Sequence, residues 1–579
     1  MQVVNYNNKY TLFRFILSLF LFAYSTQVLS AGLANNRGLM INRPDLFSPK
    51  LPDYLPDESA SSLNLPQASP VEDSEDKNIP LSQTNTPRLE LKGVIFEGNH
   101  VFSSDELTLI AQDFIGQSIT MADLEELRYR LTRYYTDKGY SNSGAMIKPG
   151  QIVKDGQVVF LIHEGTLEKV IVSGTERLSP EYVAQRIWPD EQKIFNTHEL
   201  QENFQMMLND PMIERIDGRL IPGVEPGSAL LELDVERAKP YSLRVIADNT
   251  NSPSTGSEHA RLMGTIYNLS SLGDRLDLES QYSRGVTEWA VNFSLPINRY
   301  DTRLSVRYDT TESRVVKGPL SGLDIENKYD TFELGLSHPL WKDLYGHLLL
   351  GATLSLRENQ SFLLGEAFPF SPSDDDKGIS SVSVLRLWQD YQQRTTNSVL
   401  ALRSTLSIGL DAFGATDHSG QLPDGQFVAW LGQVQYAQKV MQDAQFVVRA
   451  DLQLSNDRLL SLEQFSLGGM DTIRGYRENT LVRDQAFMAS VEFRYPVLKN
   501  IPYGHFEIVP FIDFGRAWNY SDYKEKDDLI GAGIGLTWQL KDRLDVALYI
   551  AHDIKNAPDY PDHNLQDDGI HFRVNFKLF

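Results

Sequence analysis

The sequence predicts a membrane-spanning barrel of sixteen antiparallel strands, preceded by two small α/β domains. The first observation is strict alternation of apolar and polar residues after about residue 240, as in Arg275–Tyr282 and Arg303–Asp309. Successive side chains of a strand point to opposite faces, so each such segment has one apolar face. The second observation is that short and long connections alternate between the segments. The third is a repeated β-α-α-β-β plan in the residues before them.

The lengths of the connections decide between a barrel and a soluble β-sandwich, because both folds alternate in the same way. Tight turns on one side and extended loops on the other are typical of outer-membrane barrels. We therefore predict a 16-stranded antiparallel outer-membrane barrel over residues 240–579. Its strands are predicted to begin near residues 241, 259, 275, 287, 301, 327, 344, 379, 396, 426, 443, 485, 505, 529, 543 and 569. Short connections include 297–300, 441–442 and 541–542, and long ones 312–326, 359–378, 411–425, 456–483 and 552–568.

Composition excludes several classes of function. The chain has 579 residues, no cysteine and a net charge of -23. The absence of cysteine excludes disulfide scaffolds and thiolate metal sites. The acidic balance argues against binding to nucleic-acid phosphates, which requires clustered Lys and Arg.

Residues 1–30 are predicted to be a secretory signal peptide. Lys9 and Arg14 precede the apolar run Phe15–Ala23, and the small residues Ser30 and Ala31 follow. The apolar run is too short to cross a bilayer, and no later segment has 18 consecutive apolar residues. A membrane-spanning chain of this kind must therefore be a barrel.

Residues 31–87 are predicted to be an extended linker. Proline, Ser, Asn and Asp dominate the stretch, so it cannot bury enough apolar surface to fold alone. Its prolines are Pro44, Pro49, Pro52, Pro56, Pro66, Pro70, Pro80 and Pro87.

Two α/β modules are predicted at residues 88–165 and 166–239. The second helix of the first module carries Leu124, Leu127, Leu131 and Tyr134 on one face and ends before Gly139. The first module is predicted to have strand residues Leu89, Leu91 and Val94–Phe96, helices Ser104–Asp113 and Ala122–Asp137, and a last strand Val158–His163. The second is predicted to have strand Val170–Val172, helices Glu181–Ile187 and Thr197–Asn209, and strands Ile213–Ile221 and Leu230–Val235.

The two modules carry a series of turn residues in a fixed order. They are Gly139-Tyr140, Gln151 with Gly156, Glu164-Gly165, Pro222-Gly223 and Pro226-Gly227-Ser228. Each is a common turn signal alone, but their order is more specific. Together they resemble the turns of polypeptide-transport-associated (POTRA) domains. The resemblance implies POTRA domain 1 at 88–165 and POTRA domain 2 at 166–239.

The longest connection in the barrel region carries an arginine in a glycine-rich setting. It contains Gly468-Gly469 and Arg474-Gly475-Tyr476, and it joins the eleventh and twelfth predicted strands. Inside a narrow lumen an unpaired guanidinium would be poorly hydrated, and a bidentate carboxylate would offset that loss. Asp513 shares a lumen-facing phase with Phe511 and Gly515 on the second strand after the loop.

This combination resembles the outer-membrane transporters of two-partner secretion, which are related to the central barrel-assembly protein. The resemblance covers nearly all of residues 88–579. It implies that the sixth outer loop folds into the lumen and that Arg474 docks on Asp513. The segments Glu492–Pro496 and Gly531–Gly535 are similar too.

The C-terminal strand also matches an outer-membrane protein. Phe576 and the terminal Phe579 are the residues that the barrel-assembly machinery is expected to read. The apolar set that includes Phe576 runs out of phase with Phe579, which departs from the common spacing.

The resemblance implies an outer-membrane pore of a Gram-negative bacterium that recognises a secreted exoprotein in the periplasm and translocates it unfolded. The expected partners are this exoprotein, outer-membrane lipid and lipopolysaccharide, and the assembly machinery during biogenesis. We expect no cofactor, metal, nucleotide, nucleic acid or enzymatic activity. Gly531–Gly535 leads into a strand rather than a helix, and no His-Glu-x-x-His spacing occurs.

Three other functions stay open at this point. An insertase for other barrels is the nearest, but such relatives carry more POTRA units. A diffusion porin needs no periplasmic α/β tandem, and a Sarkosyl-insoluble, heat-modifiable band on a gel would exclude a soluble enzyme. Relatives often have an N-terminal helix that plugs the pore, but residues 32–43, with Gly32, Asn35, Asn36 and Gly38, form helices poorly. The identity of the cargo and the residues in 88–239 that bind it are not predicted.

Overall fold

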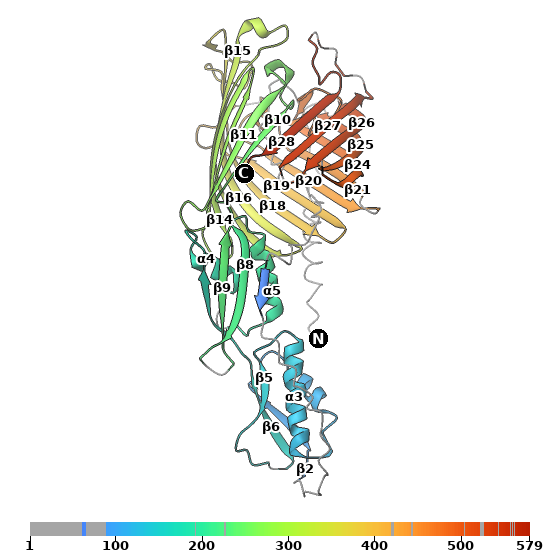
Figure 1. Ribbon diagram of the computed structural model, residues 1–579. Coiled ribbons are helices and arrows are strands. Elements are labelled where there is room, and N and C mark those ends of the chain that lie inside the picture. The colour runs from blue at the N-terminus through green and yellow to red at the C-terminus, as the bar shows by residue number, and fades with distance from the viewer. Residues whose placement is uncertain are drawn as a thin grey trace.

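The structure is a computed structural model, and two α/β domains lie in line with one end of its barrel (Figure 1). It describes residues 61–64 and 88–579, except 154, 191–192, 225–226, 419–421, 442–443, 503, 521–525, 542, 556, 559 and 561. The predicted signal peptide, the plug segment 32–43 and most of the predicted linker lie outside these residues. Within the described part, no helix is long and apolar enough to cross a membrane.

The first α/β domain packs two helices on a small sheet whose strand order is β3-β6-β5. Helix α3 begins at Thr120 because the Thr120 side chain accepts from the Asp123 backbone, while the Asp123 carboxylate accepts from Thr120. Leu127 and Leu131 are fully buried, as predicted, but Tyr135 rather than Tyr134 completes the buried face. The elements are β2 (Leu89–Glu90), β3 (Gly93–Glu97), α2 (Ser104–Ala111), β4 (Ser118–Ile119), α3 (Met121–Asp137), β5 (Gly144–Ile147) and β6 (Gln157–His163).

The second α/β domain repeats this plan with one strand more. Its core includes Phe204, Ile216 and Leu231. The additional strand β1 (Ser61–Asn64) lies within the segment predicted as linker, and it pairs in parallel with β8 at the sheet edge. No strand was predicted there, because backbone pairing at an edge requires no alternating side-chain pattern. The other elements are β7 (Leu167–Ser173), α4 (Pro180–Ile187), α5 (Thr197–Leu208), β8 (Ile213–Pro222) and β9 (Ala229–Arg237).

The barrel closes through sixteen main strands, as predicted, and the short β17 (Glu366–Ala367) adds to β16 outside this count. The predicted strand starts agree with the observed ones to within about three residues. The strands are β10 (Tyr241–Asp248), β11 (His259–Tyr267), β12 (Arg275–Ser283), β13 (Val286–Pro296), β14 (Arg303–Arg314), β15 (Ile325–Asp343), β16 (Gly346–Leu363), β18 (Ile379–Arg394), β19 (Ser398–Gly409), β20 (Val428–Lys439), β21 (Gln445–Ser455), β24 (Gln485–Ile501), β25 (Gly504–Trp518), β26 (Lys526–Leu540), β27 (Leu544–Asp553) and β28 (Ile570–Lys577).

The seam between the first and last strands is short. Strands β10 and β28 share five registered pairs, whereas β15 and β16 share eighteen. Beyond these five pairs, side-chain hydrogen bonds continue the closure: the Asn249 side chain donates to the Ile570 carbonyl and accepts from the Phe572 N–H. At the outer end of the seam, a side chain therefore supplements the backbone bond from the Asn249 N–H to the Phe572 carbonyl at 3.4 Å.

The second α/β domain is joined to the barrel by α4, which packs on two turns of the barrel. Arg186 contacts Asp301 at 3.4 Å, and its guanidinium lies over the Tyr182 ring. The Tyr182 hydroxyl donates to Asp210, and burial together with this carboxylate raises the pKa of Tyr182. Tyr182 therefore stays neutral and keeps its hydrogen bond. These contacts fix the second domain against the barrel end.

We predict that breaking β1 exposes the edge of β8. Replacing Ser62 and Leu63 together by proline removes backbone donors, so amide exchange of Ile216–Arg219 should rise by about tenfold or more. Hydrogen exchange with mass spectrometry measures this, and Ala68→Pro, outside β1, is the control. Unchanged exchange in β8 would show that β1 does not protect this edge.

Candidate functional site

The sixth outer loop, residues 456–484 between β21 and β24, is folded inside the barrel, as the resemblance implied. It contains a short helical turn, η4 (Ser461–Glu463), and two short strands, β22 (Phe465–Leu467) and β23 (Leu481–Arg483), that pair with each other. The side chains of Ile473 and Leu467 are fully buried. Together with wall residues such as Met488 they form an apolar cluster, so the loop has its own packed contact with the barrel wall.

Arg474 docks on Asp513, as predicted. Its guanidinium donates from Nε to Oδ2 at 2.8 Å and from Nη2 to Oδ1 at 2.7 Å, and its backbone N–H donates to Oδ2 at 3.0 Å. Arg474 is 1% exposed and Asp513 is 0% exposed. A bidentate pair at this depth fixes both the position and the orientation of the loop tip.

Three further wall residues surround the guanidinium, and none was assigned this contact from the sequence. Glu492 accepts from Nη1 at 2.8 Å, and the Ser490 hydroxyl accepts from Nη2 at 3.1 Å. The Phe511 ring centroid lies 3.5 Å from the guanidinium carbon. Glu492 and Ser490 share the lumen-facing phase of β24, next to Asp513 on β25. The alternation of residues along β24 could have predicted that Glu492 and Ser490 face the lumen. Their contact with Arg474 depends on the register between β24 and β25, which the sequence does not give.

Glycines on both sides let the loop approach the wall. Gly475 has φ +96°, a conformation that L side chains rarely adopt. Across from it, a Cβ added to Gly531 of β26 would lie 1.9 Å from the Arg474 carbonyl oxygen. Gly515, the last residue of the predicted docking motif, faces Ile473 in the same way. The loop can therefore approach the wall this closely only because Gly531 and Gly515 have no side chain.

Gly475 and Tyr476 extend the contact toward the last strands. The Gly475 N–H donates to Nε2 of His571 at 3.3 Å. Tyr476 is buried, and its hydroxyl donates to the Lys555 carbonyl and accepts from the Ile530 N–H at 3.2 Å. The tripeptide therefore contacts β26, the loop between β27 and β28, and β28 itself, as well as Asp513. The predicted glycines Gly468 and Gly469 both have positive φ and open the turn that precedes it.

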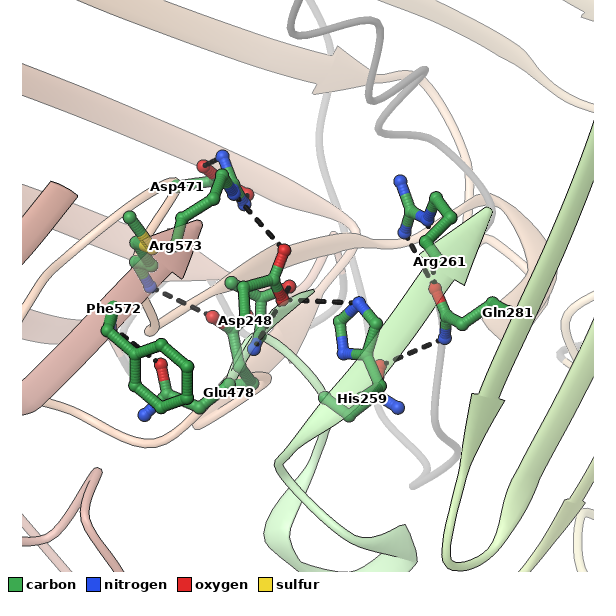
Figure 2. A network of polar contacts seen from close by, with 12 residues as sticks. Asp248, His259, Arg261, Gln281, Asp471, Glu478, Phe572 and Arg573 are labelled. Atoms are coloured by element: carbon green, nitrogen blue, oxygen red, sulfur yellow. Dashed lines mark hydrogen bonds and ion pairs between the residues drawn. The ribbon is translucent and has the colours of Figure 1, made fainter. Parts of the chain in front are cut away.

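A second ion contact ties the loop to the barrel seam, and it was not predicted. Arg573 of β28 donates to Asp471 of the loop at 3.0 and 3.2 Å and to Asp248 of β10 at 3.2 Å. Figure 2 shows Arg573 between the two carboxylates, with His259 of β11 beyond Asp248. One arginine thus links the loop to both strands of the seam.

Both C-terminal phenylalanines lie on the outer side of the barrel. Phe576 is half exposed on the outer face, opposite Val245 of β10. Phe579 follows the end of β28, and its ring lies 5.8 Å from that of Tyr241 in an edge contact. The out-of-phase terminal phenylalanine therefore still packs on the outer surface of the barrel. Its role in assembly stays a prediction.

Comparison with known proteins decides the family. The family model of the haemolysin secretion/activation protein ShlB/FhaC/HecB matches residues 227–538, more than half of the chain. The chain belongs to this family. The model of the ShlB-type POTRA domain matches residues 89–165, the first α/β domain. The protein is thus a two-partner secretion transporter of the outer membrane, with its POTRA domains in the periplasm.

Individual relatives are similar over most of their length. The chain is 21% identical to the outer membrane transporter CdiB of Dickeya dadantii over 78% of this chain and 80% of the relative. It is 23% identical to the hemolysin transporter protein ShlB of Serratia marcescens, over 69% and 71%. Among solved structures, CdiB from Escherichia coli matches with a TM-score of 0.65 at 21% identity, covering 87% of this chain and 93% of that one. BamA from Haemophilus ducreyi, lacking POTRA domains 1-3, matches with a TM-score of 0.53 at 14% identity, covering 86% and 100%. These structures support the barrel fold.

We predict that Gly531→Ala displaces the loop tip, because its Cβ would meet the Arg474 carbonyl at 1.9 Å. Trypsin cleaves after arginine, and Arg474 and Arg477 are 1% and 8% exposed. Cleavage at these two residues should accelerate by about tenfold or more. Gly264→Ala is the control, since its Cβ would make only ordinary contacts, 3.8 Å or longer. Equal protection of both variants would contradict the tight approach.

Proposed function

We propose that the protein passes its partner exoprotein through the barrel as an extended chain, beside a sixth loop that stays docked. The observation that carries this proposal is the buried Arg474–Asp513 contact, which holds the loop against the inner wall of a barrel whose one end faces the α/β domains (Figure 1). The transport role belongs to the family; the extended state of the cargo and its path are our inference.

Extended segments of the exoprotein can bind the POTRA domains by adding a strand to a sheet edge. Strand β5 lies at the edge of the first sheet. The edge at β8 of the second sheet already carries β1, which shows that it accepts an extended segment of chain. Backbone pairing of this kind binds many sequences with modest affinity, which suits a cargo that must be released from the POTRA domains into the barrel.

The lumen wall away from the loop is polar and internally paired. On β12, Arg275 donates to Asp277 at 2.8 Å, and on β14, Arg307 donates to Asp309 at 2.9 Å. These pairs cancel charge along the wall and present no large apolar surface. An extended polypeptide could slide along such a wall without being held by it.

We also infer contacts with outer-membrane lipid and with the assembly machinery. Stacked aromatic pairs lie near the periplasmic turns, Trp341 with Tyr391 and Phe506 with Trp538. Such residues anchor barrels at the membrane interface. The outward Phe576 and the terminal Phe579 are the residues through which the assembly machinery would recognise the last strand.

We predict that Arg474→Ala reduces export by about tenfold or more, because it removes the guanidinium that pairs with the buried Asp513 carboxylate and one of the hydrogen bonds that Glu492 accepts. The readout is release of the partner exoprotein, sought as a large secreted protein encoded beside this gene. Barrel assembly should persist, which a heat-modifiable band on a gel would show.

Arg516→Ala is the matched control, because this arginine of β25 is paired with Asp528 of β26 rather than with the loop. It should export normally. Export by Arg474→Ala at the level of the unchanged protein would contradict the proposed role of the docked loop.

A further inference from the structure

We propose that Glu463 is a second positioning residue of the sixth loop, which anchors the root of the loop independently of Arg474. The loop would then be fixed to the barrel wall at two places, at its root (residues 459–464) and at its tip (residues 470–476), rather than at its tip alone. Its importance for export rests on the function proposed above, but the anchoring itself does not.

Glu463 is buried between two arginines of the barrel wall. Arg386 of β18 donates from Nη2 to Oε1 at 2.7 Å and from Nη1 to Oε2 at 3.0 Å. Arg357 of β16 donates from Nη1 to Oε1 at 3.3 Å and to the Leu462 carbonyl, also at 3.3 Å. The carboxylate is 1% exposed, so removing its charge would leave buried arginines without this partner.

Apolar packing surrounds this ion contact. Leu459, Leu460 and Leu462 of the loop are each 3% exposed or less. They form a cluster with Val382 and Val384 of β18 and with other wall residues. This cluster is separate from the two clusters that contain the loop tip. Each end of the loop therefore has its own apolar contact and its own ion contact.

The neck of the loop is closed by amide hydrogen bonds. The Gln453 side chain donates to the carbonyls of Glu463 and Asp484, at 3.0 and 3.1 Å. The Asp484 carboxylate accepts from the Gln464 side chain at 2.9 Å and from the Leu459 N–H at 3.2 Å. These bonds join the segment by which the loop leaves β21 to the segment by which it enters β24, next to Glu463.

The two anchors lie on different parts of the wall and have opposite polarity. Glu463 binds the seventh and eighth barrel strands, β16 and β18, whereas Arg474 binds the twelfth and thirteenth, β24 and β25. In the contact with β16 and β18 the loop supplies the Glu463 carboxylate, and in the contact with β24 and β25 it supplies the Arg474 guanidinium. Neither end could occupy the other's position, because like charges would meet. Opposite polarity thus specifies how the loop lies across the lumen.

The test uses the absence of cysteine in the chain. Leu462→Cys reports on the root and Thr472→Cys on the tip, at positions 2% and 3% exposed. Each reporter is combined with Glu463→Gln, with Arg386→Gln or with Arg474→Ala, and labelled by a polyethylene-glycol maleimide in outer membranes. Heat-modifiable mobility verifies that each barrel is folded.

We expect Glu463→Gln and Arg386→Gln to raise labelling of the root by about tenfold or more, while the tip stays protected. Arg474→Ala should do the reverse. Glu333→Gln is the matched control, because Glu333 lies 3.8 Å from Arg357 but belongs to the wall. It should change neither reporter.

Three results would overturn the proposal. Unchanged root labelling in folded Glu463→Gln and Arg386→Gln would show that the ion contact anchors nothing. Root labelling in Arg474→Ala as fast as in Glu463→Gln would show that one contact at the tip holds the whole loop. Loss of export with unaltered loop labelling would contradict Glu463 as a positioning residue, and it would leave the proposed function standing.

Discussion

The buried contact between Arg474 and Asp513 is the constraint on which the rest of the barrel interior depends. A guanidinium that is 1% exposed must be paired, since the cost of burying it alone is several kcal/mol. The pairing requires a loop long enough to cross the lumen, a positive φ at Gly475 and a wall without side chains at Gly531. It also requires Asp513 to keep its phase on β25. A one-residue slip of that strand would turn the carboxylate toward lipid.

Much of this could be predicted because it follows from local patterns. Period-two alternation and turn lengths predicted sixteen strands, and the strand phase placed Asp513 in the lumen. The predicted pair of Arg474 and Asp513 is present. The contacts that were missed depend on alignment between distant segments. Glu492 reaches Arg474 only through the register of β24 with β25, and Arg573 reaches Asp471 only because the barrel closes. Strand β1 was missed because its partner edge, not its own sequence, makes it a strand.

The energetics favour a loop that stays in place. Its tip combines the Asp513 and Glu492 contacts, the Phe511 ring and two apolar clusters. Separating these would cost several kcal/mol for the ion contacts alone, in a compartment without ATP. Among the residues that the structure describes, no ion pair joins the polar wall of β12 and β14 to the loop, so the cargo could pass along this wall while the loop remains docked. The loop would then shape the pore rather than open and close it.

A disulfide between the loop and the wall tests this claim most directly. A Cβ at Gly515 would lie 2.9 Å from Cγ1 of Ile473, the position that the sulfur of a cysteine at residue 473 would take, so a disulfide would replace the contact between Ile473 and the wall. Ile473→Cys combined with Gly515→Cys would therefore lock the loop to β25, and export of the partner exoprotein would be compared before and after reduction. If the docked loop only shapes the pore, export should be equal in the oxidised and the reduced protein. Export that stops in the oxidised protein and returns on reduction would show that the loop must leave the wall, which contradicts the account.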